Sequence, residues 1–199
     1  MIVKADQPDH PPIDLEAMPP WRVTSERYLE LISSGKLGPE DKVELINSMI
    51  TSMSPAGPKH NAVVRRLTRL FGSVLDRHDL QVQGTVHLSN GQIFDPDITV
   101  IRLQNDEVLE DRHPGPGDIM LIVEAAGSSM KRDAQVKMPV YAAAGIPEYW
   151  IADIENQTLI VHRDPTDHGY ALIQQFKGDT PVVADAVEGL SLAPAAIFA

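Results

Sequence analysis

Three carboxylates stand at positions where ordinary surface acids are uncommon. Glu44 and Asp97 each lie inside a short apolar run, and Glu124 directly follows the most apolar run of the chain, Ile119 to Val123. A buried carboxylate is costly unless a cation or a metal ion pairs with it. Mg²⁺ prefers oxygen ligands, typically one or two carboxylates with several retained waters. Such acids, converging near a lysine, are typical of a magnesium site for phosphodiester hydrolysis, where the ion and the ammonium group both stabilise negative charge.

Other catalytic sites are not supported by the sequence. The run Ser128-Ser129-Met130-Lys131 matches Ser-x-x-Lys, but the companion motifs of the serine β-lactamases, Ser-Asp-Asn and Lys-Thr-Gly, are absent. The seven histidines include no His-Glu-x-x-His pair, and no glycine-rich phosphate loop occurs. Taken singly, each of the three acids is more often an ordinary strand-end residue, so the prediction depends on their convergence.

Composition limits the class of protein. The chain has 199 residues, 43% of them apolar, which suits one globular domain with a buried core. It has no cysteine, which excludes disulfides, thiolate metal sites and cysteine nucleophiles. No apolar run approaches the ~20 residues of a membrane span, and the N-terminus turns polar early, so we expect a cytoplasmic protein without a membrane partner. The net charge of −11 argues against binding of a polyanion over a large surface. A nucleic-acid role therefore needs a local basic patch or a metal ion.

The first half of the chain predicts a proline-rich arm followed by alternating helices and strands. Five prolines within the first twenty residues predict a flexible arm over residues 1–22, preceding one domain over residues 23–199. Thr24 is a candidate N-cap for a short helix that ends near Gly35. Apolar periodicity predicts a helix over 60–77, whose opposite face carries Arg65, Arg66, Arg69 and Arg77; this stripe is most simply a solvated face. The expected strands are 43–46 and 49–51 around an Asn47-Ser48 turn, 81–88, and 92–101 with an interruption at Pro96.

The second half predicts a loop over 104–118, a central strand over 119–123 and a helix from residues 127–129 to Gly145. Pro139 should kink or restart that helix. Three further strands are expected over 149–153, 158–162 and 170–174. These elements together predict an α/β fold with a mixed sheet and helices packed on it.

The ordered series of motifs resembles the Uma family of restriction-endonuclease-like proteins, within the PD-(D/E)XK nuclease superfamily. The resemblance covers the chain from Thr24 to Phe198. It rests on these residues: Glu44-Leu45-Ile46-Asn47, Ser54-Pro55, His60, Pro96-Asp97-Ile98, Val123-Glu124, Asp133, Lys137, Tyr141 and Gly145-Ile146-Pro147-Glu148-Tyr149-Trp150. It implies a three-layer α/β sandwich, with a central mixed sheet flanked by helices. It also implies that Asp97 and Glu124 are the two motif acids and Glu44 an additional acid.

One position departs from the superfamily pattern. The lysine expected two residues after the second acid is replaced by Ala126. In this family the lysine resembles one displaced onto the following helix, here Lys137, which by spacing shares a face with Asp133 and Tyr141.

The resemblance implies a metal-dependent endonuclease acting on DNA, with Mg²⁺, or Mn²⁺ in its place, held by Asp97 and Glu124. Glu44 is expected to hold a second ion or to position water, and Lys137 to stabilise charge or orient the nucleophile. His60 is either a packing residue at a helix start or a participant near the scissile phosphate or the metal ion. The alternative is an inactive nuclease-fold module that binds nucleic acid or a protein partner. A homodimer formed through the strands after Trp150 is also open.

Overall fold

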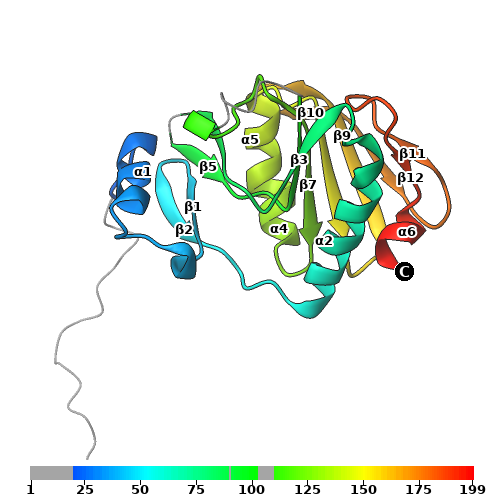
Figure 1. Ribbon diagram of the computed structural model, residues 1–199, viewed down its shortest axis with the longest axis horizontal. Coiled ribbons are helices and arrows are strands. Elements are labelled where there is room, and N and C mark those ends of the chain that lie inside the picture. Colours follow the sequence, from blue (N-terminus) through cyan, green and yellow to red (C-terminus); the bar gives the residue numbers. More distant parts are fainter. Residues whose placement is uncertain (1–19, 90, 103–109) are drawn as a thin grey trace, which may run out of the picture.

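The computed structural model describes residues 20–89, 91–102 and 110–199. A six-stranded sheet forms the centre, in the order β10-β9-β8-β7-β6-β3, and only the β7–β8 pair is parallel (Figure 1). Its strands are β3 (His78–Val82), β6 (Ile98–Arg102), β7 (Ile119–Ala126), β8 (Glu148–Asp153), β9 (Thr158–Thr166) and β10 (Gly169–Phe176). A mixed sheet of this kind was expected from the sequence and is confirmed.

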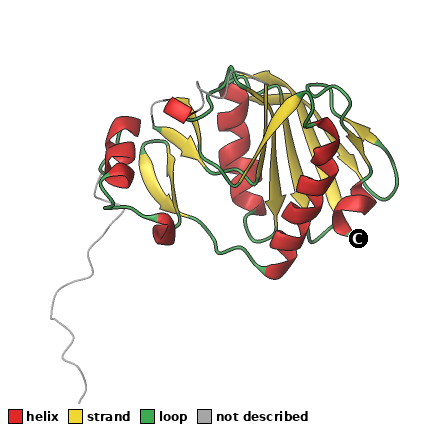
Figure 2. Cartoon of the chain, viewed as in Figure 1, coloured by secondary structure: helices red, strands yellow, loops and turns green. Residues whose placement is uncertain are grey.

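Helices cover both faces of this sheet, as Figure 2 shows. On one face lies α2 (Pro58–Phe71), continued by η3 (Gly72–Val74), and α6 (Pro194–Phe198) packs against α2. On the other face lie α4 (Met130–Arg132), η4 (Asp133–Lys137) and α5 (Met138–Ala143). All eight residues of β7 are buried, and its apolar residues divide between a cluster with α2 and a cluster with α5. The central strand is apolar over most of its length because both of its faces are covered.

A smaller lobe stands beside the large sheet. It contains α1 (Ser25–Ser33), η2 (Pro39–Asp41) and a sheet in the order β2-β1-β5-β4. Its strands are β1 (Val43–Ile46), β2 (Met49–Ser52), β4 (Val86–Ser89) and β5 (Gln92–Phe94). The predicted cap and turn are confirmed: the Thr24 hydroxyl accepts from the Arg27 amide, and Asn47 and Ser48 both have positive φ, as a tight hairpin requires.

Two predicted strands are wrong in extent, for one reason. The run 81–88 is divided into β3 and β4, and the run 92–101 into β5 and β6. In each run the chain crosses from one sheet to the other. The first crossing follows Gln83, which has a φ of 50°, and the second contains Pro96, which has no amide hydrogen for a ladder. The second crossing places Asp95 and Asp97 between the two sheets.

The helix ends also differ from prediction. The helix expected over 60–77 begins at Pro58, because proline fits a first turn, and its α-helical part ends at Phe71. The helix expected to begin at residues 127–129 begins at Met130. The predicted restart at Pro139 is present: the π-helical turn η4 ends at Lys137, the Met138 amide donates to the Asp133 carbonyl, and α5 begins at Met138 with Pro139 in its first turn. The ladder changes register there because Pro139 cannot supply the next amide donor.

The remaining predictions concern the N-terminal arm, one loop and the edge of the large sheet. The predicted arm lies outside the described residues as far as residue 19, and the predicted loop 104–118 does so over 104–109. The hairpin of β11 (Val182–Val183) and β12 (Ser191–Leu192) was not predicted. β10 is an edge strand with Leu172 and Ile173 exposed, and the homodimer through this region stays a prediction. In the part of the chain that is described, every helix is too short or too polar to cross a bilayer.

A buried acid at the start of β8 is expected to determine much of the stability. The Glu148 carboxylate accepts from the Trp150 indole and the Arg163 guanidinium, both at 2.8 Å, and from the amides of Asp185 and Ala186. Glu148→Ala leaves these donors without their acceptor. We expect a loss of about 3–5 kcal/mol in the free energy of unfolding, measured by urea denaturation.

Glu148→Gln serves as the matched control, since it keeps an acceptor oxygen and should lose less. Equal losses for the two variants, or a loss below about 1 kcal/mol for alanine, would contradict this account.

Candidate active site

The register of the central strands brings the two motif acids together. β6 and β7 are antiparallel, and Ile98 pairs with Val123. Continued by one residue, this register sets Asp97 opposite Glu124, and opposed residues point to the same face with Cβ atoms about 5 Å apart. The Asp97 Oδ2 atom accepts from the Ala125 amide at 2.8 Å, directly beside Glu124. Asp97 is 7% exposed and Glu124 5%. The predicted convergence of these two acids is therefore present.

Lys137 joins the core to the small lobe. Its Nζ atom donates to Glu44 Oε1 at 2.8 Å and to Glu124 Oε1 at 2.9 Å, and only 3% of the residue is exposed. The Tyr141 hydroxyl donates to the same Glu124 oxygen at 3.1 Å. The displaced lysine thus reaches the strand end that bears Glu124, although it lies on the helix after that strand.

Charge and burial have opposite effects on the pKa values of Lys137 and Glu124. Burial alone lowers the pKa of Lys137, but the carboxylates of Glu124 and Glu44 outweigh it, and the pKa lies above its ordinary value. Burial raises the pKa of Glu124 well above that of a free glutamate, and Lys137 offsets only part of the effect. Lys137 is consequently a firmly protonated cation. Burial disfavours the ionised form of Glu124, and a further cation would stabilise that form.

Glu44 lies on the far side of Lys137. Its Oε1 atom accepts from Lys137 and from the Asp95 amide at 3.2 Å, and its buried Oε2 atom has no hydrogen-bond partner. Its role as a ligand of a second ion stays a prediction. What the structure describes is a carboxylate that holds the lysine.

His60 lies at the start of α2, in contact with the motif acid. Its Nε2 atom is 3.0 Å from Asp97 Oδ1, and its Nδ1 atom is 2.9 Å from the Ala125 carbonyl oxygen. Both neighbours are acceptors when Asp97 is ionised, so both contacts are satisfied only by the imidazolium, which carries a hydrogen on each nitrogen. The hydrogen bond to Asp97 raises the pKa of His60, against the effect of burial. The structure therefore places His60 at the acids and not only in the core.

Two further acids, Asp95 and Asp133, belong to this cluster and were not among the predicted site residues. The Thr85 hydroxyl donates to Asp95 at 2.7 Å, and burial raises the pKa of Asp95. Asp133 is 2% exposed, and burial raises its pKa as well. The Asp-Pro-Asp spacing contained a signal for Asp95, since two residues of separation return a side chain to the same side of an extended chain.

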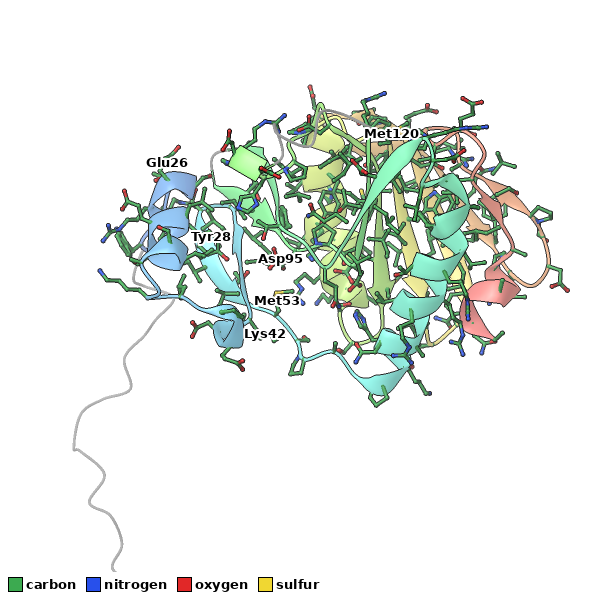
Figure 3. The ribbon with its side chains drawn as sticks, viewed as in Figure 1. Glu26, Tyr28, Lys42, Met53, Asp95 and Met120 are labelled. Carbon is green, nitrogen blue, oxygen red and sulfur yellow. The ribbon has the colours of Figure 1, made fainter. Side chains whose placement is uncertain are left out.

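A cavity of about 810 Å³ opens between the small lobe and the core. Its lining includes the side chains of Asp97, Glu124, Lys137 and His60, together with Asp95 and Asp133, but not Glu44. In Figure 3, Asp95 lies between the two lobes and Met53 reaches from the end of β2 toward the core. Of the predicted site residues, Asp97, Glu124, Lys137 and His60 therefore share one cavity, and Glu44 does not line it.

The donor set of this cavity fits a magnesium ion that keeps several waters. Asp97 and Glu124 supply carboxylate oxygens, and the buried acids Asp97, Glu124 and Asp133 outnumber the buried cation Lys137. Across residues 20–89, 91–102 and 110–199, no three His, Asp or Glu side chains are arranged to hold one ion by themselves. Mg²⁺ does not require such a cage, because it is commonly bound by one or two carboxylates, water and substrate phosphate.

Comparison with known families agrees with this geometry. The model of the Uma2 family, described as "Putative restriction endonuclease", matches residues 25–195. The chain belongs to the Uma2 family. Its fold is shared with a crystal structure of a putative nuclease of the DUF820 group from Anabaena variabilis, at 18% identity and a TM-score of 0.68. That match covers 88% of this chain and 97% of the other. No curated protein matches the chain.

Membership in the Uma2 family confirms the resemblance read from the motif series. The restriction-endonuclease-like fold class is confirmed as well, because the fold with its central mixed sheet and helices matches that of the structural neighbour. The family and this neighbour together indicate a nuclease.

Proposed function

We propose that this Uma2-family protein is a magnesium-dependent endonuclease that hydrolyses phosphodiester bonds in DNA. The observation that carries the proposal is the meeting of Asp97 and Glu124, from neighbouring strands, in one cavity with Lys137. Two buried acids with a buried lysine are the components that metal-assisted phosphodiester hydrolysis requires. Mn²⁺ is expected to substitute for Mg²⁺, since both favour oxygen ligands.

The acids and the lysine of the site have different proposed roles. Asp97 and Glu124 would hold the ion, and the Ala125 amide fixes the orientation of the Asp97 carboxylate. A bound Mg²⁺ would offset charge on the scissile phosphate and lower the pKa of a coordinated water. Lys137, held in place by Glu44, presents a fixed positive charge beside Glu124 for the charge that develops on the phosphate.

His60 is a candidate proton donor. In the imidazolium form it donates to Asp97, and it lies in the wall of the cavity. Because Asp97 and the Ala125 carbonyl hold its two N–H groups, His60 would hydrogen-bond to a phosphate oxygen or protonate a leaving oxygen by releasing the Nε2–H from Asp97. We propose this role in place of a purely structural one.

The test is hydrolysis of end-labelled DNA by the purified protein. We expect cleavage in Mg²⁺ or Mn²⁺ and a loss of at least about a hundredfold in EDTA, restored when Mg²⁺ is added back in excess. Asp97→Asn, purified in the same way, controls for a contaminating nuclease. Cleavage that survives EDTA, or that is unchanged in this variant, would contradict the proposal.

The alternative is a module that binds nucleic acid or a protein partner without turnover. The net charge of −11 is the observation in its favour. DNA binding that persists in Asp97→Asn, with no hydrolysis by the native protein in either metal ion, would support the module.

A further inference from the structure

The candidate cavity extends well beyond the acids. Its opposite wall comes from the small lobe and is largely apolar, formed by Tyr28, Ile32, Leu37, Val43 and Met53. Ile32 is 43% exposed, and Leu37, Val43 and Met53 are only partly buried. Metal-assisted hydrolysis of a phosphate does not require an apolar wall. An apolar surface facing a phosphate site suits a planar, stackable group attached to that phosphate.

The depth of the acids restricts which form of DNA can reach them. Asp133, Lys137, Glu124 and Asp97 are between 2% and 7% exposed, so a phosphodiester must enter the cavity to meet them. Duplex DNA is stiff over ~150 base pairs, and delivering one of its nucleotides into a pocket requires unstacking and unpairing. An unpaired strand meets no such cost.

The dimensions agree with a single nucleotide. A volume of about 810 Å³ lies within the ~300–1,000 Å³ range of sites that enclose one drug-sized molecule. With its phosphate at the acids, the nucleotide's base would lie toward Met53 and Leu37. Methionine suits this wall because its flexible, polarizable side chain adapts to different ring faces.

Cations line the same cavity. Lys42, in the small lobe, and Lys59, in α2, are exposed, and Arg132 donates from the core to the Ser52 carbonyl of the small lobe. On a chain of net charge −11, this group supplies positive charge on a lining that also carries acids. It would contact the phosphates on either side of the one that enters, as expected for a groove that follows a single strand.

From these observations we infer that the substrate is unpaired DNA, one nucleotide of which enters the cavity with its base against the apolar wall of the small lobe. This inference rests on the proposed nuclease function and specifies the substrate of the same site. Fully paired duplex is then a poor substrate, and cleavage of duplex occurs at bulges, flaps or other unpaired nucleotides.

The first experiment compares three labelled DNAs of one sequence: a single strand, its full duplex, and the duplex with a central bulge of unpaired nucleotides. In Mg²⁺ we expect the single strand and the bulge to be cleaved at least about tenfold faster than the full duplex, with cuts in the bulged DNA at the unpaired nucleotides. Equal or faster cleavage of the full duplex would overturn the inference and leave the nuclease function standing.

The second experiment measures binding separately from turnover. Fluorescence anisotropy of the same DNAs in Ca²⁺ should show at least about tenfold tighter binding of the single strand than of the duplex. This holds even if the native protein hydrolyses nothing, so failure of the proposed function and failure of this inference are distinguishable. Equal affinity for the two forms would overturn the inference.

Two variants locate the binding surface. Met53→Glu places a charge on the apolar wall and should weaken single-strand binding about tenfold or more, whereas Ile173→Glu, on exposed edge strand β10, should not. Lys42→Ala with Lys59→Ala should reduce the slope of log affinity against log salt by ~0.7 for each phosphate that these lysines no longer neutralise. Met53→Glu binding like the native protein, or an unchanged salt slope, would show that the strand does not lie in this cavity.

Discussion

Asp97→Asn is expected to lower the rate of DNA hydrolysis by at least about a thousandfold while the protein stays folded. Asparagine keeps an oxygen that can accept from the Ala125 amide, so the local hydrogen bond survives. It has no negative charge for a divalent ion and none for the His60 imidazolium. The reduced rate therefore reports chemistry and not collapse of the site.

Glu124→Gln is the companion change. Its amide oxygen can still accept from Lys137 and Tyr141, the two donors to Glu124 in the native chain. We expect a similar decrease in hydrolysis, and metal binding measured by calorimetry should weaken in both variants. Urea denaturation checks the fold.

The matched control for these two changes is Glu155→Gln, which also lies on the cavity but is exposed, in the turn that follows β8. It should keep nearly full activity. If Asp97→Asn or Glu124→Gln cleaved DNA as fast as this control, the two acids would not hold the ion, and the proposed mechanism would fail.

Lys137→Met is expected to reduce both activity and stability. Methionine fills much of the same space but leaves Glu44 and Glu124 as two buried acids without their cation. Breaking a buried pair in this way costs about 3–5 kcal/mol in the free energy of unfolding. Turnover should fall by about a hundredfold to a thousandfold, since the fixed charge beside the phosphate is removed.

Metal affinity distinguishes the roles that Lys137 can have. Removing a positive charge beside Glu124 should not weaken binding of Mg²⁺ and should make the site more attractive to it. Mg²⁺ should accordingly raise the stability of Lys137→Met by at least as much as that of the native protein. A large decrease in metal affinity would show that the role of Lys137 has been misassigned.

Lys131→Met provides the control on the same helical segment, because Lys131 is exposed. A surface lysine of this kind contributes within about 1 kcal/mol. The double variant Lys137→Met with Glu44→Gln tests the second carboxylate: removing one of the two unpaired acids should recover part of the stability, giving a coupling energy of about 1–3 kcal/mol.

Local sequence patterns predicted much of the secondary structure. The cap at Thr24, the Asn47-Ser48 turn and the buried strand before Glu124 followed from residue types and periodicity, because each depends on neighbours within a few positions. Two strands were predicted too long. Periodicity records that a segment is extended, but not that the chain changes sheets at Gln83 and at Pro96.

The sequence by itself identified a globular composition, an α/β order of elements, the family, and the acids Asp97, Glu124 and Glu44 with Lys137 and His60 as candidates. Only the tertiary structure determined which of these side chains lie next to one another. Strand register sets Asp97 opposite Glu124, while the packing of the small lobe turns Glu44 toward Lys137 and adds Asp95 to the cluster. Contacts between residues far apart in the chain depend on how sheets and helices pack, and no local pattern of side chains encodes that arrangement.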